Sequence, residues 1–448
     1  MKFGRWLRVG MHVKRWLALL LAGITLVSLA LAMGLATLYR TYDFPDPATS
    51  LVQSGTLQFI PHPYRETLVG LLGLVVTALA LYKLGASLLS PFLRVRGGRH
   101  KELVEAIERH RFGAPPPAIR VVAIGGGTGL STLLRGLKRH EQLAITAIVS
   151  IADDGGSSGR LREEFDMPPP GDIRNCIVAL ADAEPLLGRL FQYRFEQEAS
   201  ALHGHSFGNL FLAAMTGMTG SFEEAVTEVS RVLAVRGEVL PTTLEKVTLC
   251  ADLADGSYVC GESNITAAPA AVRRLHLEHR PEANPAAVEA LLDADLIVLG
   301  PGSLYTSVLP NLLVDGIAQA VRFSSATVVY VCNVATQRGE TDHFGAADHV
   351  RALYGHVGSD LLDVVMVNEN FAEAGKIRPE WGVDAVGLAG LEELPGAAAI
   401  ARRDLASTAT PLRHDPDKLA DALIALATAR AGLGAAARAA EPRVAAAV

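Results

Sequence analysis

Residues 119–137 read IRVVAIGGGTGLSTLLRGL, and this stretch decides the fold. The run from Ile119 to Ile124 is apolar, as is typical of a buried strand. Five glycine-rich residues, Gly125–Gly129, follow at once, and leucines then recur at helical spacing from Leu130 to Leu137. A strand, a glycine turn and a helix in this order present backbone N–H groups and the positive end of a helix to an anion. The sequence therefore predicts a βα unit with a phosphate-binding turn.

Two more polar loops follow within a short distance. An apolar run over residues 145–151 predicts a second strand, which ends in the polar loop 153–160. Residues 168–175, with the sequence PPPGDIRN, begin a helix that the pattern extends over residues 173–195. Because open α/β sheets bind ligands at the carboxyl ends of their strands, we expect these loops to share one site. A tight connection is the plainer interpretation of the first turn, since Leu130 stands where the dinucleotide pattern requires a third glycine.

The rest of the chain continues the alternation of strands and helices. Apolar runs at residues 295–299, 328–333 and 364–368 predict further buried strands, and the first of them leads into a second glycine loop, GPGS at 300–303. Residues 246–251 and 257–261 alternate around Asp255-Gly256, which predicts a hairpin. The fold class is therefore α/β, a Rossmann-like doubly wound parallel sheet with a small antiparallel excursion.

Two long apolar stretches precede this domain. Residues 16–39 contain no charged residue and residues 67–90 contain only Lys83, and each stretch exceeds the roughly 20 residues that cross a bilayer. Basic residues flank the pair on both sides and are scarce in the connecting segment, which places both termini in the cytoplasm. We therefore predict two transmembrane helices with the large domain in the cytoplasm. A signal peptide is the alternative for the first stretch, although its apolar part is long for one.

Composition and cysteine content limit the class of protein. The 448 residues carry a net charge of −6, which argues against a general nucleic-acid binder. The four cysteines are Cys176, Cys250, Cys260 and Cys332, and no two of them have metal-ligand spacing. We interpret them as small, buried, unpaired residues of a reducing compartment. The pair His203 and His205 is too weak a signal to predict a metal site.

Seven blocks of the sequence resemble the gluconeogenesis factor family, in the superfamily of the archaeal 2-phospho-L-lactate transferase (CofD-like). They are GGGTGL at 125–130, ADDGGSSGRLR at 152–162, PPGDIRNC at 169–176, GHSFGNL at 204–210, RVLAVRG at 231–237, LGPGSLYT at 299–306 and QRGETD at 337–342. The resemblance covers residues 118–426 and implies binding of UDP-sugars, notably UDP-N-acetylglucosamine, with effects on carbon metabolism, cell shape and envelope synthesis. The N-terminal part lies outside it.

The expected organisation follows from these observations. We predict a membrane anchor over residues 1–98, a juxtamembrane helix and Pro-rich linker over 99–117, a CofD-like nucleotide-sugar-binding domain over 118–426, and an Ala-rich tail over 427–448. The anchor departs from the simplest family members, which begin near the first glycine strand. Expected partners are a nucleotide-sugar ligand and the membrane, with a homo-oligomer allowed. No protein partner can be identified.

The candidate ligand-binding residues lie in the loops and blocks described above. Glycines let the backbone approach a phosphate, arginines pair with a diphosphate, and carboxylates accept hydrogen bonds from a ribose or hold a divalent cation, unless they only cap turns. Arg413 is included because the resemblance places its block near the ligand. The candidates are Gly125, Gly126, Gly127, Thr128, Gly129, Asp153, Asp154, Ser157, Arg160, Arg162, Asp172, Arg174, Asn175, His205, Ser206, Asn209, Gly300, Gly302, Ser303, Tyr305, Thr306, Gln337 and Arg413.

The sequence contains no recognisable catalytic pair. It shows no Ser-His-Asp signature and no reactive-cysteine context, so no catalytic residue is assigned and no cofactor is required. The resemblance therefore favours a regulator that binds UDP-N-acetylglucosamine. A transferase acting on a phosphorylated or nucleotide-linked substrate, similar to the archaeal relative, is the alternative, and a nucleotide-sugar glycosyltransferase is a more distant one.

Overall fold

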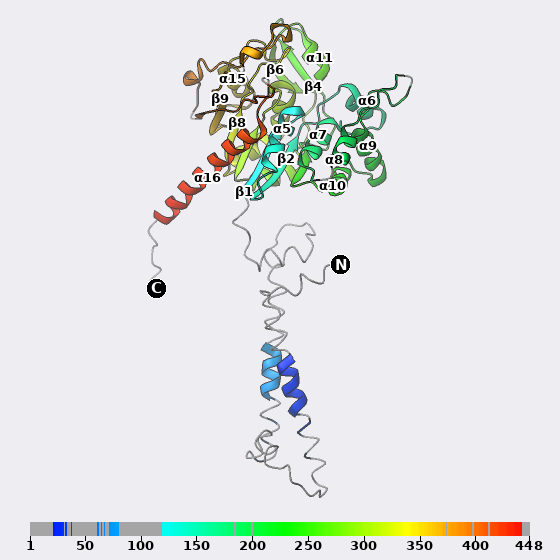
Figure 1. The fold of residues 1–448 in the computed structure, drawn as a ribbon, viewed down its shortest axis with the longest axis vertical. Helices are drawn as coiled ribbons and strands as arrows, with labels where there is room; N and C mark the ends of the chain where they lie inside the picture. The colour runs from blue at the N-terminus through cyan, green and yellow to red at the C-terminus, as the bar shows by residue number, and fades with distance from the viewer. Residues whose placement is uncertain are drawn as a thin grey trace. The chain divides into compact units, whose positions relative to one another are not determined.

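The computed structural model describes most of the C-terminal three quarters of the chain and parts of the N-terminal quarter (Figure 1). The described residues are 21–30, 32, 33, 37, 61, 64, 67, 71–79, and 119–440 apart from 183–184, 199, 373, 397 and 411–412. The chain divides into two compact units, residues 1–117 and residues 118–448.

In the N-terminal unit, residues 21–30 and 71–79 are helical and pack closely. A Cβ atom on Gly73 would lie 2.9 Å from the backbone nitrogen of Val27, and one on Gly23 would collide with Thr77. Only parts of the predicted spans 16–39 and 67–90 are among the described residues, and the whole of 99–117 lies outside them. No helix in the described part has both the length and the apolar character needed to cross a membrane.

The C-terminal unit is built on a seven-stranded sheet whose neighbouring strands are all parallel. The order is β10-β9-β8-β7-β1-β2-β3, so the chain adds β2 and β3 on one side of β1 and β7 to β10 on the other. The predicted doubly wound α/β class is confirmed. The strands are β1 (Ile119–Gly125), β2 (Leu143–Val149), β3 (Glu238–Pro241), β7 (Leu296–Leu299), β8 (Thr327–Val331), β9 (Val364–Asn368) and β10 (Ala399–Arg403).

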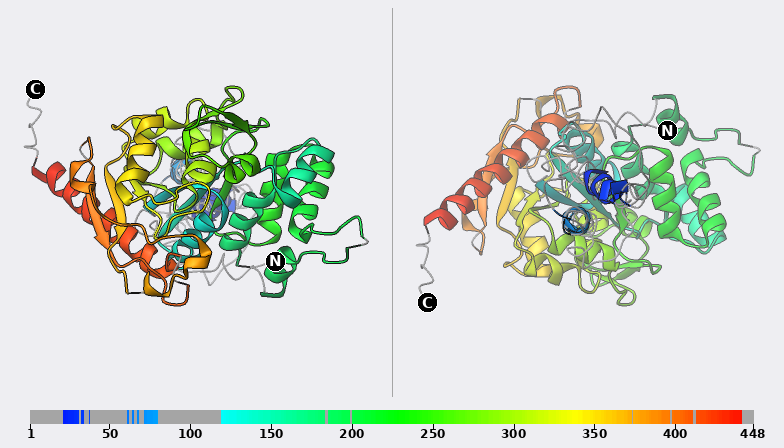
Figure 2. Two further views of the ribbon diagram at one scale, coloured as in Figure 1. Left: turned by 90° about the horizontal axis from the view of Figure 1, so that it is seen from above. Right: turned by 90° about the horizontal axis from the view of Figure 1, so that it is seen from below.

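Helices cover both faces of this sheet (Figures 1 and 2). Side chains alternate along β1, so that Val121 and Ala123 join one core cluster while Val122 and Ile124 join the other. The helices are α5 (Gly127–Leu137), α6 (Gly156–Glu164), α7 (Gly171–Leu180), α8 (Pro185–Gln192), α9 (Phe207–Thr219), α10 (Phe222–Val232), α11 (Glu262–Ala267), α12 (Pro285–Leu292), α13 (Leu309–Leu312), α14 (Ile317–Phe323), α15 (Ala346–Val357) and α16 (Pro416–Ala440), with a π-helix η2 (Leu304–Val308).

Several element boundaries differ from the sequence-based prediction. The helix expected over residues 173–195 is two helices, because α7 ends where the backbone becomes extended at Ala181, and α8 begins at Pro185, a residue that suits the first turn of a helix. The loop expected over 153–160 becomes helical at Gly156. Strands β3 and β10 were not predicted, since they are short and β10 is a partly exposed sheet edge. Helix α16 continues past residue 426, where the Ala-rich tail was expected to begin.

A separate three-stranded antiparallel sheet confirms the predicted excursion. Its order is β5 (Tyr258–Cys260), β4 (Leu249–Leu253), β6 (Val272–Leu277). In this register Cys250 lies directly opposite Cys260, and the two form a disulfide. The expectation of four unpaired cysteines was therefore wrong for this pair, because the hairpin brings together residues that are ten apart in sequence. Cys176 and Cys332 are free and buried.

Candidate functional site

The two glycine loops lie in contact, because the strands that lead into them are neighbours in the sheet. A Cβ atom on Gly129 would lie 2.5 Å from the carbonyl oxygen of Pro301 and 2.7 Å from the Cα of Gly302. Only glycine allows this approach. The loops meet between β1 and β7, where the strand order changes direction, which is the usual ligand position in such sheets.

The start of α5 is already occupied by a carboxylate from elsewhere in the chain. Gly126, the N-cap residue of α5, has no side chain that could cap the helix. The backbone N–H of Gly127 donates to Asp172 at the start of α7. Burial, with the nearby charge of Asp153, raises the pKa of Asp172 to about 6. An internal anion therefore sits where the glycine turn was predicted to bind phosphate.

The second glycine loop has the same arrangement. Glu340 is 3% exposed and accepts hydrogen bonds from the hydroxyl of Ser303 and, at 2.6 Å, from the Nε2 of Gln337. The hydroxyl of Thr306 lies 3.2 Å from the same carboxylate, and the backbone N–H groups of Tyr305 and Thr306 also donate to it. Burial raises the pKa of Glu340. Its place inside the QRGETD block was the only sequence signal for this residue.

The two aspartates after β2 each accept hydrogen bonds near the start of a helix. Asp153 accepts from the backbone N–H of Gly155 at 2.9 Å, just before α6. Asp154 accepts from the N–H and the hydroxyl of Ser263, at 3.0 and 2.7 Å, at the start of α11. The contact of Asp153 is the local turn-capping one, whereas Asp154 joins two segments that lie 109 residues apart in the sequence.

Five carboxyl groups influence one another at this edge of the sheet. Burial and the negative charges of its neighbours raise the pKa of Glu262 from 4.5 to about 9, so this side chain is protonated at neutral pH and can donate a hydrogen bond. Sequence reasoning did not select Glu262. Among the described residues no group of three or more His, Cys, Asp or Glu side chains is placed to hold a metal ion. The five are Asp153, Asp154, Asp172, Glu262 and Glu340.

A buried polar cluster joins α6 to α9. The hydroxyl of Ser157 lies 3.0 Å from Nδ1 of His205 and accepts from Nδ2 of Asn209 at 3.1 Å. Burial lowers the pKa of His205, so the ring is neutral at pH 7, and in the tautomer that carries its proton on Nε2 it accepts the proton of Ser157. All three side chains are buried. This pair of a hydroxyl and a base is 48 residues apart in sequence, so spacing alone did not reveal it.

Arg174 is a buried cation whose hydrogen-bond partners are uncharged. It donates to the hydroxyl of Ser206 and, at 2.9 Å, to Oδ1 of Asn175, while its Nε has no partner among the described residues. The side chain is 6% exposed, and burial lowers its pKa to about 10, with Arg194 adding to the effect. Since it still carries its charge at neutral pH, an anion here would be strongly favoured.

The remaining candidates lie around this centre. Arg160 donates to the carbonyl of His203 at 2.7 Å, and Arg162 to the hydroxyl of Thr248 at 3.4 Å. Tyr305 is buried, and burial raises its pKa to about 12. Thr128 accepts at its carbonyl from Thr132 within α5.

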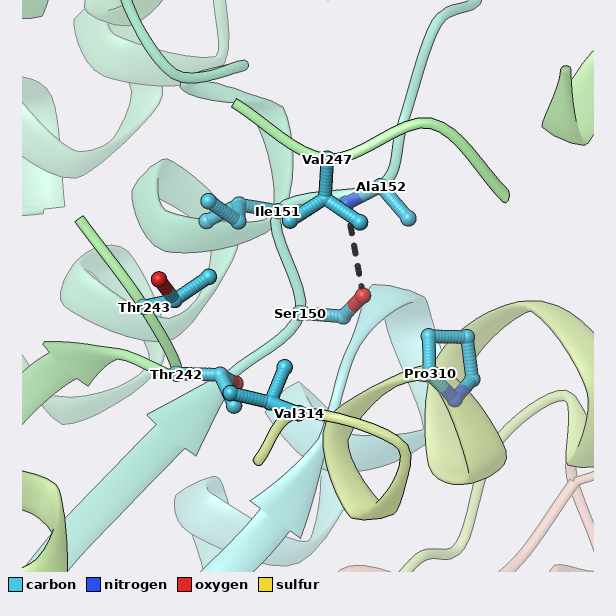
Figure 3. Close-up of a pocket in the computed structure, with 8 residues that line it drawn as sticks. All are labelled: Ser150, Ile151, Ala152, Thr242, Thr243, Val247, Pro310 and Val314. Carbon is cyan, nitrogen blue, oxygen red and sulfur yellow. Dashed lines mark hydrogen bonds between the residues drawn. The ribbon is translucent and has the colours of Figure 1, made fainter. Parts of the chain in front are cut away.

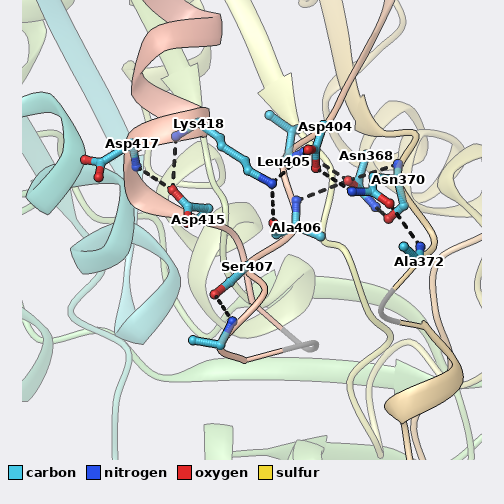
Figure 4. Close-up of polar contacts among 11 residues, drawn as sticks. Asn368, Asn370, Ala372, Asp404, Leu405, Ala406, Ser407, Asp415, Asp417 and Lys418 are labelled. Carbon is cyan, nitrogen blue, oxygen red and sulfur yellow. Dashed lines mark hydrogen bonds and ion pairs between the residues drawn. The ribbon is translucent and has the colours of Figure 1, made fainter.

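The segment before α16 is held beside β9 by a polar network (Figure 4). Asn368 accepts from the backbone N–H of Leu405 at 3.0 Å, and Lys418 donates to Asp404 at 2.8 Å. This arrangement places His414 next to the end of β8, with Nε2 3.2 Å from the carbonyl of Cys332. Its neighbour Arg413 is exposed, and its proximity to a ligand stays a prediction from the resemblance.

A small hollow adjoins the ends of β2 and β3 (Figure 3). It encloses about 180 Å³, open solvent included. A hollow this small suits ordered water rather than a nucleotide sugar. Its walls are Ser150, Ile151, Ala152, Thr242, Thr243, Val247, Pro310 and Val314.

Known proteins match both the sequence and this fold. The profile of 2-phospho-L-lactate transferase CofD matches residues 121–385. A protein named "Putative gluconeogenesis factor" from Nostoc sp. (strain PCC 7120) is 43% identical over 428 residues, covering 94% of this chain and 91% of that protein. The "Gluconeogenesis factor" of Bacillus subtilis (strain 168) is 47% identical, covering 68% of this chain and 98% of that protein.

A solved structure supports the same relationship. A crystal structure of a Bacillus halodurans protein aligns with a TM-score of 0.65 at 46% identity and covers 68% of this chain and 98% of that one. The alignment with the Bacillus subtilis protein leaves about a third of this chain without a counterpart, whereas the alignment with the Nostoc protein spans nearly all of it.

Proposed function

This chain belongs to the CofD family and, within it, to the gluconeogenesis factors. On that premise we propose that it is a regulatory protein that binds UDP-N-acetylglucosamine or a related nucleotide sugar. Such a regulator links the supply of a nucleotide sugar to carbon metabolism, cell shape and envelope synthesis. The contact between the two glycine loops at the switch point of the sheet is the observation that carries the proposal.

The donors at this edge suit the diphosphate of such a ligand. Helices α5, α6 and α7 all begin there without a side-chain cap from their own N-cap residue, so their first N–H groups can donate to an anion once Asp172 has left Gly127. Arg174 adds a buried positive charge without a charged hydrogen-bond partner. In this proposal the diphosphate lies over Gly125–Gly129 and Gly300–Ser303.

The carboxyl groups suit the remainder of the ligand. Ribose and hexose hydroxyls donate to ionised carboxylates, and the protonated Glu262 can donate to a carbonyl such as that of the acetamido group. A diphosphate must displace Asp172 from Gly127 or reach the loop together with a cation. We therefore propose that a divalent cation entering with the ligand strengthens binding, which titration with and without magnesium measures.

Two matched glycine variants test the phosphate position. Gly127 has φ +60°, and a Cβ atom there would meet only the hydroxyl of Ser307, at 3.7 Å. Gly220 has φ +76° at the end of α9, and a Cβ atom there would meet nothing within 4 Å. Both Gly→Ala changes therefore carry a similar backbone cost of about 1–2 kcal/mol.

Calorimetry with UDP-N-acetylglucosamine separates the two variants. Gly127→Ala is expected to weaken binding at least tenfold, because the methyl group takes the space of a phosphate oxygen, while Gly220→Ala binds like the wild type. Equal affinities for the two variants would mean that the phosphates lie elsewhere. Failure of the wild type to bind any UDP-sugar would reject the proposed function.

A transferase is the second candidate, favoured by the profile match and by the contact of Ser157 with His205. A neutral histidine that accepts a hydroxyl proton is the arrangement of a general base. Incubation with phospholactyl and nucleotide-linked donors and a hydroxyl acceptor tests this reading. Turnover that disappears in His205→Gln, together with no binding of UDP-sugars, would establish the transferase instead.

We also propose that residues 16–39 and 67–90 anchor the protein in a membrane, with the large domain in the cytoplasm. The basic flanks on both sides of the pair motivate this orientation. A cysteine introduced between residues 43 and 62 should react with an impermeant thiol reagent added to intact cells. Labelling of a cysteine introduced just after residue 98 would show the opposite orientation.

A further inference from the structure

The disulfide between Cys250 and Cys260 lies next to the candidate site. Cys260 ends β5, an edge strand of three residues, and Cys250 is buried in the central strand β4. Strand β5 is paired only with β4, over three residue pairs. The disulfide therefore adds a covalent link between this edge strand and the central strand of the small sheet.

The residues that follow Cys260 reach directly into the cluster of five carboxyl groups. Gly261 donates its N–H to the carbonyl of Leu249 at 2.8 Å, and the side chain of Asn264 donates to the carbonyl of Cys260 at 2.9 Å. Between them, Ser263 holds Asp154 with two hydrogen bonds. Glu262, whose pKa is raised by burial and by its four acidic neighbours, lies in the same turn.

The local geometry leaves little room for this turn to shift while the strand stays fixed. Gly261 has φ +97°, and a Cβ atom there would lie 2.6 Å from Oδ2 of Asp154. The turn thus packs against the aspartate through its backbone. Movement of β5 would be passed on to Asp154 and Glu262, because no residue intervenes between Cys260 and the turn.

We propose that Cys250 and Cys260 form a redox-modification site that controls the order of the Gly261–Asn264 turn. The order of this turn then controls the hydrogen bonds from Ser263 to Asp154. In the oxidised protein the cross-strand bond pins β5 and keeps the turn in place. In the reduced protein β5 keeps its three residue pairs with β4, the bond from Gly261 to Leu249 and the contact of Tyr258 with His276, but it loses the covalent link, and the turn opens more often. Small edge strands of this length have little stability of their own.

The chemistry is a thiol–disulfide exchange. A dithiol reductant attacks through its thiolate, forms a mixed disulfide with one cysteine, and releases the other as a thiol. Its second thiol then displaces the first cysteine, so two electrons and two protons pass to the protein while the reductant becomes a disulfide. Cys260 is only partly buried, whereas Cys250 is fully buried, so the attack takes place at the sulfur of Cys260.

Hydrogen exchange on the full chain tests the proposal. The protein is compared in its oxidised form and after treatment with dithiothreitol, and thiol trapping with mass spectrometry assigns the redox state of each cysteine. Amide exchange over residues 259–264 is expected to rise about tenfold on reduction, because loss of the cross-link lowers the free energy needed to open this segment. Exchange over β6, which stays paired with β4, is expected to change little.

The double variant Cys250→Ser, Cys260→Ser is the matched control. It should exchange like the reduced wild type with and without dithiothreitol, which also excludes a contribution from the buried thiols Cys176 and Cys332. Unchanged exchange at 259–264 in reduced wild type would overturn the proposal. So would free thiols at both positions after oxidation with oxidised glutathione.

A second measurement, which rests on the proposed function, follows the consequence for binding. Affinity for UDP-N-acetylglucosamine is expected to fall several-fold on reduction of the wild type and to stay constant in the double variant. Equal affinities of the two redox forms would overturn the control of the site by the disulfide. Absence of binding in both forms would count against the proposed ligand alone, because the exchange experiment needs no ligand.

Discussion

The protonation of Glu262 makes the stability of this protein depend on pH in a defined direction. Burial is the largest cause of its raised pKa, and the charges of Asp153, Asp172, Glu340 and Asp154 add to it. The pKa rises from 4.5 to about 9 on folding. Replacing this residue by the neutral Glu262→Gln, which keeps its shape, should therefore stabilise the folded protein at neutral and alkaline pH.

The sign and size of the effect follow from proton linkage. Below pH 4.5 the carboxyl group is protonated in both the folded and the unfolded chain, so it does not lower the free energy of unfolding. Between pH 4.5 and about 9 only the unfolded chain loses the proton, and the free energy of unfolding falls by about 1.4 kcal/mol per pH unit. At pH 7 this amounts to about 3 kcal/mol, which screening of a partly exposed group reduces to about 1–2 kcal/mol.

Urea denaturation at pH 5, 6, 7 and 8 and constant ionic strength measures this difference. The gain in Glu262→Gln over the wild type should be small at pH 5 and should grow to about 1–2 kcal/mol by pH 7. Glu289→Gln, at an exposed position on α12, is the control and should show no such trend. A gain that is independent of pH, or a loss of stability at pH 8, would refute the assignment of a protonated Glu262.

Three other substitutions have expected outcomes. Arg174→Met, which removes a buried charge while keeping an apolar stem, should weaken nucleotide-sugar binding about 100-fold by calorimetry without lowering the melting temperature much; unchanged affinity would remove this residue from the site. Gly129→Ala should cost about 1–3 kcal/mol in urea denaturation, because its methyl group would lie 2.5 Å from the carbonyl of Pro301; a wild-type stability would show that the loops separate easily. Lys418→Met should cost about 1 kcal/mol, since it loses the bonds to Asp404 and to the carbonyl of Ala406; an unchanged urea midpoint would mean that the other bonds hold this segment.

Sequence patterns predicted those parts of the fold that depend on neighbours along the chain. The apolar run that becomes β1, the glycine turn after it and the leucines of α5 are local signals, and the structure confirms all three. The turn residues Asp255-Gly256 likewise indicated the β4–β5 hairpin. Weaker local signals failed, since β3 has four residues and β10 lies at an exposed edge, so neither shows a clear pattern.

The contacts within the site could not be predicted in the same way. The bond from Gly127 to Asp172 joins the starts of two different helices, and that from Ser303 to Glu340 joins two loops. Both carboxylates occupy helix starts that, from the sequence, looked free for a phosphate. Side-chain pairs such as Ser157 with His205 also depend on how α6 and α9 pack, which no spacing along the chain reveals.

The amino-acid sequence by itself determined the class of the sheet, the positions of the two glycine loops and the family. It did so because strand and helix periodicity, turn chemistry and long motif blocks are properties of short segments. Only the tertiary structure decided that the two loops touch, that five carboxyl groups share one edge, and that Cys250 faces Cys260. The physical reason is that these contacts depend on strand order and register, which the packing of the whole domain selects.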